Sequence, residues 1–232
     1  MNTQKGNVLF LILIAVALFA ALSYAVTQST RGGGNADDES ALIDSAAMTQ
    51  FGASVATAIM RMRLAGVEET DFCFYTGNNS TDYNHATCSD NTNNVFHADG
   101  GGVSYQDPPN GLSSSTEWEF NARPQVYGQG TTVPSSSGND TADLVMVLRD
   151  VDTSICEAIN ENVGISGIPE DSGDLNLDRF DGDYTQADGI DGCNPNCTTV
   201  GDSPIGAVSA NFGCILEQLT GENLYFHVLL AR

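Results

Sequence analysis

The feature that most constrains this chain is an uninterrupted apolar run near its N-terminus. The segment from Val8 to Val26 is 19 residues long and contains no Asp, Glu, Lys or Arg. At about 1.5 Å per helical residue, its length comes close to the ~30 Å hydrocarbon core of a bilayer. A secretory signal has a shorter apolar core of about 7–15 residues. The run therefore predicts one membrane-spanning helix. A signal-peptidase cut after Ala25 stays open, because small residues stand at Ser23 and Ala25.

A second helical pattern follows a glycine-rich break at residues 32–36. Apolar side chains recur there every three or four residues, which is the period of a helix with one apolar face. They are Ile43, Ala47, Phe51, Val55, Ile59 and Met62. We expect a hydrophobic helix over residues 7–31, an amphipathic helix over 37–66 and a globular head over 67–232.

The charge of the chain is strongly acidic. Asp and Glu number 30 against 8 Lys and Arg, and the formal net charge is −22. Proteins that bind nucleic acid carry clustered Lys and Arg that displace counterions from phosphates. The composition therefore argues against a nucleic-acid partner and suits an exported, soluble head.

Six cysteines follow the apolar run. An even number of cysteines beyond an export segment predicts disulfides in an oxidising compartment. Of the possible pairings, we favour Cys73 with Cys88 and Cys193 with Cys197, because each pair closes a short polar loop, which leaves Cys156 with Cys214. A zinc site is the alternative, although the single C-x3-C pattern has no second pair or nearby histidine to complete four ligands.

The head has the pattern of a β-rich domain. Residues 72–118 read as loops and short strands, whereas residues 116–127 and 141–151 read as strands. Residues 152–165 read as a short helix with Asp152 as N-cap, and residues 212–232 as a hairpin. The predicted fold class is α+β, with an antiparallel sheet packed on the amphipathic helix.

The N-terminal residues "QKGNVLFLILIAVALFAAL" resemble those of type IV pilins and pseudopilins. In that family a membrane prepilin peptidase cuts after a glycine that ends a short leader. The resemblance implies that residues 1–6 are the leader, that Lys5 and Gly6 mark its end, and that Asn7 becomes the new N-terminus. It also implies a lollipop: a long helix, first hydrophobic and then amphipathic, carrying a disulfide-bearing head.

One position departs from the family. Most members carry a glutamate as the fifth residue after the cut, and this chain has Leu11 there. That carboxylate is thought to pair with the N-terminal amine of a neighbouring subunit, and a buried amine without a partner is costly. The departure favours a minor or tip subunit over an ordinary shaft subunit.

A cluster of aspartates between residues 174 and 191 is a candidate calcium site. Carboxylate oxygens are the ligands that Ca²⁺ prefers, although the spacing here does not fit an EF-hand loop. The candidate ligands are Asp178, Asp181, Asp183, Asp188 and Asp191. A solvated acidic loop without metal is the alternative.

No nucleophile, zinc-protease or phosphate-loop motif occurs in the sequence, so we do not expect an enzyme. The pattern and the resemblance together predict a structural subunit of a type IV pilus-like filament or secretion pseudopilus. Such a subunit would sit in a bacterial inner membrane before assembling with homologous pilin subunits outside the cell. The alternative is a membrane-anchored or secreted recognition domain that works as a monomer.

Overall fold

The computed structural model describes residues 7–29, 33–109, 111–126, 129–130, 142–171, 179–182, 184, 199–200, 210–217 and 220–232. The chain divides into two compact units, Met1–Ser40 and Ala41–Arg232. We describe each unit by itself.

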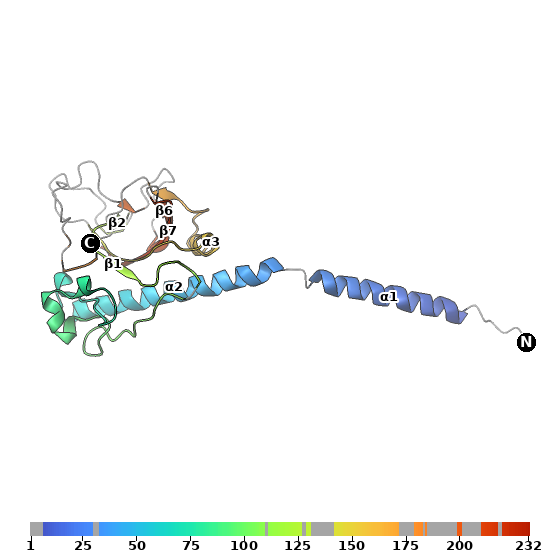
Figure 1. Ribbon diagram of the computed structural model, residues 1–232, viewed down its shortest axis with the longest axis horizontal. Coiled ribbons are helices and arrows are strands. Elements are labelled where there is room, and N and C mark those ends of the chain that lie inside the picture. Colours follow the sequence, from blue (N-terminus) through green and yellow to red (C-terminus); the bar gives the residue numbers. More distant parts are fainter. Residues whose placement is uncertain are drawn as a thin grey trace, which may run out of the picture. The chain divides into compact units, whose positions relative to one another are not determined.

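The first unit is helical. It contains helix α1 (Asn7–Ser29) and the start of helix α2 (Gly33–Leu64) (Figure 1). The helix α2 begins at Gly33, within the break that the sequence predicts over residues 32–36. Within the described part of the chain, we find no helix with both the length and the hydropathy that crossing a membrane requires.

The second unit is an α+β domain built on a five-stranded sheet. The strand order is β1 (Glu119–Asn121), β3 (Leu144–Leu148), β7 (Asn223–Leu230), β6 (Phe212–Glu217) and β4 (Glu170–Asp171). The first four strands are antiparallel, and β4 pairs with β6 in parallel. A separate parallel pair joins β2 (Gln125–Val126) to β5 (Thr199–Val200). The predicted antiparallel sheet is confirmed.

The C-terminal hairpin supplies the centre of the sheet. Strand β7 pairs with β6 on one side and with β3 on the other. Side chains alternate between the two faces of the sheet, as the pleat requires. On β3, Leu144, Met146 and Leu148 belong to the larger apolar cluster, whereas Val145 and Val147 belong to a second cluster on the opposite face.

The helix α2 covers the face with the larger cluster, from Ala41 onward (Figure 1). Phe51 is 4% exposed, and Val55 and Ile59 are fully buried. The helix comes close to β7 at Gly52, where a Cβ atom would overlap the ring of His227. Part of the predicted stripe is wrong, because Ile43 is 69% exposed and Ala47 is also exposed. The buried positions in this part of the helix are instead Ala41, Ser45 and Met48.

The helix α3 (Thr153–Asn162) lies against β6 on the same side of the core. Asp152 caps it as predicted, since its side chain accepts a 2.9 Å hydrogen bond from the Ser154 backbone N–H. Near its end, the buried Asn160 amide donates to the Cys214 carbonyl (3.0 Å) and accepts from the Cys214 N–H (2.8 Å). This side chain joins the helix to the sheet without leaving a polar group unpaired.

The polypeptide between α2 and the sheet forms four short 3₁₀ helices instead of the short strands that the sequence suggested. They are η1 (Glu69–Asp71), η2 (Thr81–Tyr83), η3 (Ala86–Ser89) and η4 (Asn91–Asn93). Aromatic rings hold this region to the core. Phe74 stacks on Phe120 with centroids 4.3 Å apart, and the Tyr83 hydroxyl accepts from the Phe120 N–H at 3.0 Å. Trp118 is 1% exposed and belongs to the same core.

Candidate functional site

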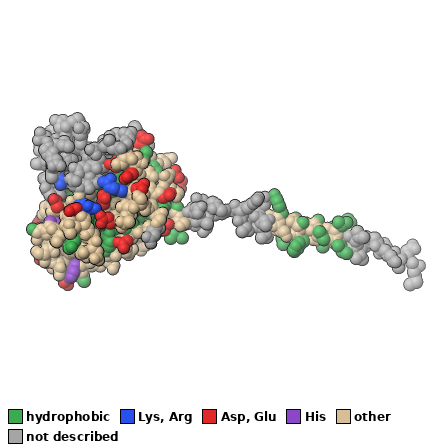
Figure 2. Space-filling view, viewed as in Figure 1, with side chains coloured by type: hydrophobic (Ala, Val, Ile, Leu, Met, Phe, Trp, Pro, Cys, Tyr) green, Lys and Arg blue, Asp and Glu red, His purple; other side chains and the backbone are tan. Residues whose placement is uncertain are grey.

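The surface of α1 is apolar on every side. All described side chains of this helix, residues 10–24, are exposed. The large ones include Phe10 (61%), Leu18 (65%) and Phe19 (73%). Figure 2 shows hydrophobic side chains along this helix, in contrast to the many acidic side chains on the head. Large contiguous apolar surfaces are rare on soluble monomers and mark sites of contact with a membrane or with another protein.

The fully exposed positions of α2 between residues 42 and 60 carry no charge, and the one charged residue of this length, Asp44, is partly buried. The exposed positions are Leu42, Ile43, Ala46, Ala47, Gln50, Ala53, Ser54, Thr57 and Met60. We call these nine residues the outer face of α2. None is Asp, Glu, Lys or Arg, in a chain whose net charge is −22.

Two hydroxyl groups on the outer face are already satisfied within the helix. Ser54 donates to the Phe51 carbonyl at 2.7 Å, and Thr57 donates to the Ala53 carbonyl at 2.8 Å. Small residues allow helices to approach closely, and satisfied hydroxyls lower the cost of removing water. The outer face is therefore suited to packing against another helix.

Of the predicted processing residues, only Asn7 is described. It is the first residue of α1. Lys5 and Gly6 lie outside the described residues.

Two of the predicted disulfides are confirmed. Cys73 bonds to Cys88, and Cys156 bonds to Cys214, which ties α3 to β6. Cys193 and Cys197 lie outside the described residues.

The structure describes only one of the five candidate calcium ligands. Asp181 is exposed, and the other four candidate ligands, Asp178, Asp183, Asp188 and Asp191, lie outside the described residues. Among the residues that the structure describes, the only cluster with metal-ligand spacing is Cys73, His85 and Cys88. Because both sulfurs belong to a disulfide, this cluster offers no thiolate ligands.

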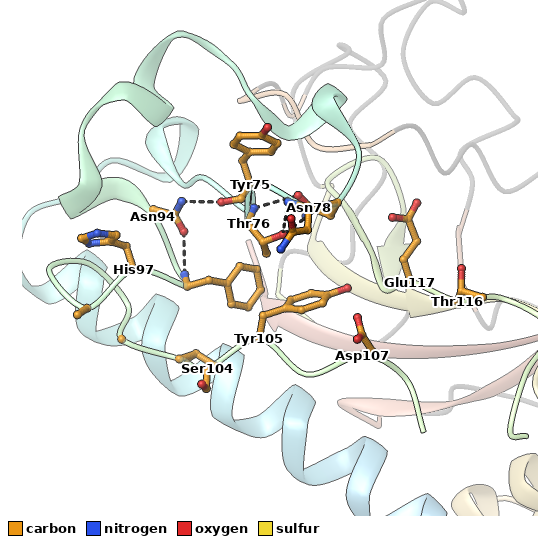
Figure 3. A pocket seen from close by; sticks show the side chains of 15 residues that line it. Tyr75, Thr76, Asn78, Asn94, His97, Ser104, Tyr105, Asp107, Thr116 and Glu117 are labelled. Carbon is orange, nitrogen blue, oxygen red and sulfur yellow. Dashed lines mark hydrogen bonds between the residues drawn. The ribbon is translucent and has the colours of Figure 1, made fainter. Parts of the chain in front are cut away.

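A groove of about 790 Å³ lies on the head, between the loops that precede β1 (Figure 3). Its aromatic lining comes from Tyr75, Phe96 and Tyr105, all partly exposed. Figure 3 shows Tyr105 directed toward Asp107 and Glu117 at one end of the groove. The remaining lining is largely polar: Thr76, Asn78, Asn79, Asn94, His97, Ser104 and Thr116.

The rings of the groove continue the aromatic core. Phe96 and Tyr105 meet edge to face, with centroids 5.1 Å apart. Phe96 also lies 5.6 Å from Phe120, and Tyr105 lies 6.2 Å from Phe51. Because Phe96 and Tyr105 pack on the buried rings of Phe120 and Phe51, their positions do not depend on a ligand.

Asparagine amides brace the loops around the groove. Asn94 donates to the Tyr75 carbonyl at 2.7 Å and accepts from the Phe96 N–H at 2.8 Å. Asn79 accepts from the Thr76 N–H at 2.9 Å and donates to the Phe74 carbonyl at 2.8 Å. These bonds fix the backbone that carries Tyr75 and Phe96.

The glycine run explains how the two sides of the groove come together. A Cβ atom at Gly100 would overlap the Asn94 carbonyl, and one at Gly101 would overlap the Val95 carbonyl. The absence of side chains here lets the Val103 N–H reach the Val95 carbonyl at 3.2 Å. The segment with Tyr105 thus returns beside the segment with Phe96.

Charge gathers at one end of the groove. The pKa of the Tyr105 hydroxyl is raised to about 12, mainly by burial and also by the nearby Asp107 and Glu117 carboxylates, although a backbone hydrogen bond with Trp118 acts in the opposite direction. The Glu117 carboxylate pairs with the Arg179 guanidinium. None of the residues that line the groove is Lys or Arg.

No motif in the sequence predicts this groove. Its residues come from a stretch read only as polar loops and short strands, and no recognisable motif connects them. The one signal was the density of aromatic and Asn residues between residues 74 and 105, interrupted by three consecutive glycines.

Comparison of the chain with protein-family models, with curated proteins and with solved structures finds no match. The resemblance to pilins therefore rests on the N-terminal residues alone.

Proposed function

We propose that this protein is a pilin-like structural subunit of an extracellular type IV pilus-like filament or secretion pseudopilus. The observation that carries the proposal is the apolar surface of α1. Its described side chains are exposed all round the helix, with Phe19 at 73% and Leu22 at 65%. Burial stabilises apolar surface by about 25 cal/mol per Å², so such a helix gains strongly from leaving water.

The outer face of α2 supports the same conclusion. The inward side of this helix is already buried by the head, yet the outward side carries small and uncharged residues. A helix with nothing to contact usually has a charged solvent face. In the proposed filament, the helices of neighbouring subunits cover α1 and the outer face of α2.

The membrane stage of the proposal rests on the sequence. The run from Val8 to Val26 would hold the precursor in the inner membrane, with the head outside the cytoplasm, before subunits assemble. A prepilin peptidase would cut between Gly6 and Asn7. In this arrangement the helix and head form the lollipop shape of a pilin, and Leu11 in place of glutamate suits a minor or tip position.

The mature N-terminus gives the first test. Mass spectrometry of protein purified from the native host should find a chain that begins at Asn7, with or without a methyl group. A chain that begins at Val26 would instead support the alternative of an ordinary secreted recognition domain.

Assembly gives the second test. Ile14→Asp places a charge on the apolar helix and should abolish both membrane retention and filaments, whereas Ile14→Val should leave both intact. The assay is fractionation of the cells followed by electron microscopy of sheared material. Normal filaments from the Ile14→Asp variant would overturn the proposal.

A further inference from the structure

The aromatic groove on the head has no role in assembly as proposed above. We infer that it binds a neutral saccharide. This inference does not rest on the filament proposal, because every lining residue belongs to the unit Ala41–Arg232 and none lies on α1 or α2.

The shape of the groove suits a ligand of several rings. Its volume of about 790 Å³ falls in the range of small-molecule sites, which is about 300–1,000 Å³. That space is far larger than a single metal ion or ammonium group needs. The loops are held in place by the Asn79 and Asn94 amides and by Arg61, which donates to the Gly101 carbonyl. A preorganised wall lowers the entropy lost on binding.

The lining places apolar groups beside polar groups, which is the arrangement that a sugar presents. A pyranose has apolar C–H faces and a rim of hydroxyl groups. The partly exposed rings of Phe96 and Tyr105, which meet edge to face, offer apolar platforms with a polar tip on the tyrosine, whereas the Tyr75 ring points away from them (Figure 3). The exposed Asp107 carboxylate can accept two hydrogen bonds from adjacent hydroxyls, and the Asn78 amide can both donate and accept.

The charges of the groove exclude other ligand classes. Phosphates, sulfates and acidic sugars need Lys or Arg, and none lines the groove. Asp107 and Glu117 would repel an anion, and the net charge of −22 adds to that repulsion. A cationic peptide is the remaining competitor. It is disfavoured because Glu117 already pairs with Arg179, which leaves Asp107 as the one acidic group of the lining that no ion pair neutralises among the described residues.

The first experiment is a glycan array probed with the full chain in detergent micelles. The array carries neutral, sialylated and sulfated oligosaccharides, and an oligolysine peptide is spotted beside them. We expect binding to one or more neutral oligosaccharides, and none to their sialylated or sulfated forms. Binding only to acidic glycans, only to oligolysine, or to nothing at all would overturn the inference.

The second experiment places the ligand in the groove. The best neutral oligosaccharide from the array is titrated by calorimetry against Asn78→Ala and Asp107→Asn, because both side chains are exposed in the lining. Each should weaken binding about tenfold or more, since each removes a contact in a site with few of them. Glu157→Gln is the matched control, because Glu157 is exposed on α3 and outside the lining, and the affinity of this variant should stay within about twofold.

A conservative variant separates a loss of binding from a loss of folding. Tyr105→Phe keeps the ring that packs on Phe51 and Phe96 and removes only the hydroxyl beside the two carboxylates. It should keep the circular dichroism and melting temperature of the parent and still lose affinity several-fold. Unchanged affinity in Tyr105→Phe, Asn78→Ala and Asp107→Asn together would place the saccharide elsewhere and overturn the assignment.

Discussion

Both sides of α2 are rich in uncharged residues, but one side is buried against the head and the other is exposed. On the inner side Phe51, Val55 and Ile59 lie against the sheet, almost without exposure. On the outer side Ile43 is 69% exposed and Met60 is 49% exposed, although Asp44, at the edge between the two sides, is the only charged residue over this length. The difference teaches that absence of charge on a helix does not identify its core face. Here one uncharged face completes the head, and the other is the face that the proposed filament would bury.

The largest contrast between the two faces should appear on truncation. Phe51→Ala removes a ring that contacts both Trp118 and Tyr105, so the free energy of unfolding should fall by about 3–5 kcal/mol. Met60→Ala on the outer face should change it by less than about 0.5 kcal/mol. Urea denaturation of the full chain in detergent measures both. Equal losses would mean that the outer face is also part of the core.

The disulfides test how the inner face is held to the sheet. The bond between Cys156 and Cys214 closes a separation of 58 residues, and the bond between Cys73 and Cys88 closes one of 15 residues. In the chain-entropy treatment these correspond to about 4 and about 3 kcal/mol. The double Ser variant at 156 and 214 should therefore melt lower than the double Ser variant at 73 and 88. The reverse order in calorimetry would show that the loop around η2 and η3 matters more to the core than α3 does.

A smaller contrast concerns two buried titratable groups. Burial lowers the pKa of His227 to about 4. The His227 ring stacks on Phe212 and shares a 2.9 Å hydrogen bond with the Tyr225 hydroxyl. Burial raises the pKa of Asp143 to about 6, even though the Val126 and Arg232 N–H groups donate to its carboxylate. His227 contributes stability above pH ~6.5 that is lost as the pH falls through 4, whereas Asp143 contributes stability at low pH that is lost as the pH rises through 6.

The two contributions oppose each other between pH 7 and 4, and each is on the order of 3 kcal/mol. Relative to the parent chain, His227→Gln should therefore gain stability as the pH falls from 7 to 4, and Asp143→Asn should lose it. Urea midpoints at pH 4, 5, 6 and 7 measure the slopes, and the difference from the parent cancels groups common to all three chains. Slopes of the same sign for the two variants would contradict the burial argument for at least one of them.

The sequence predicts local structure well where one physical signal dominates. The Asp152 cap, the C-terminal hairpin, strand β3 and the pairing of Cys156 with Cys214 all follow from short-range pattern or simple spacing. The inner stripe of α2 was partly misassigned, because a helix with two uncharged faces satisfies the same three- and four-residue spacing in two ways. Ile43 and Ala47 fitted the pattern and yet point outward.

The groove could not be predicted from the sequence, and the reason differs from that for α2. Phe96 and Tyr105 lie on separate loop segments, and their contact depends on the amide of Asn94 and on close carbonyl contacts at the glycine run. Likewise, the buried Asn160 amide joins α3 to Cys214 across 54 residues of sequence. Long-range contacts of polar side chains carry no periodic signal, so only the folded chain reveals them.

The variant with the smallest expected change in stability gives the most direct test of the outer face. Ala53→Glu places a charge at an exposed helical position, where the free energy of unfolding should change by less than about 0.5 kcal/mol, since Glu is a good helix former and meets water there. In an assembled filament the same carboxylate would be buried against a neighbouring helix without a partner, at a cost of several kcal/mol. Cells that produce this variant should therefore hold stable, correctly folded subunits and no filaments, whereas Ala53→Ser should assemble normally. The measurements are the melting temperature of the purified chain and electron microscopy of sheared filaments. Filaments that form normally with Ala53→Glu would show that solvent reaches the outer face after assembly, and the likeness of the two faces of α2 would then need another explanation.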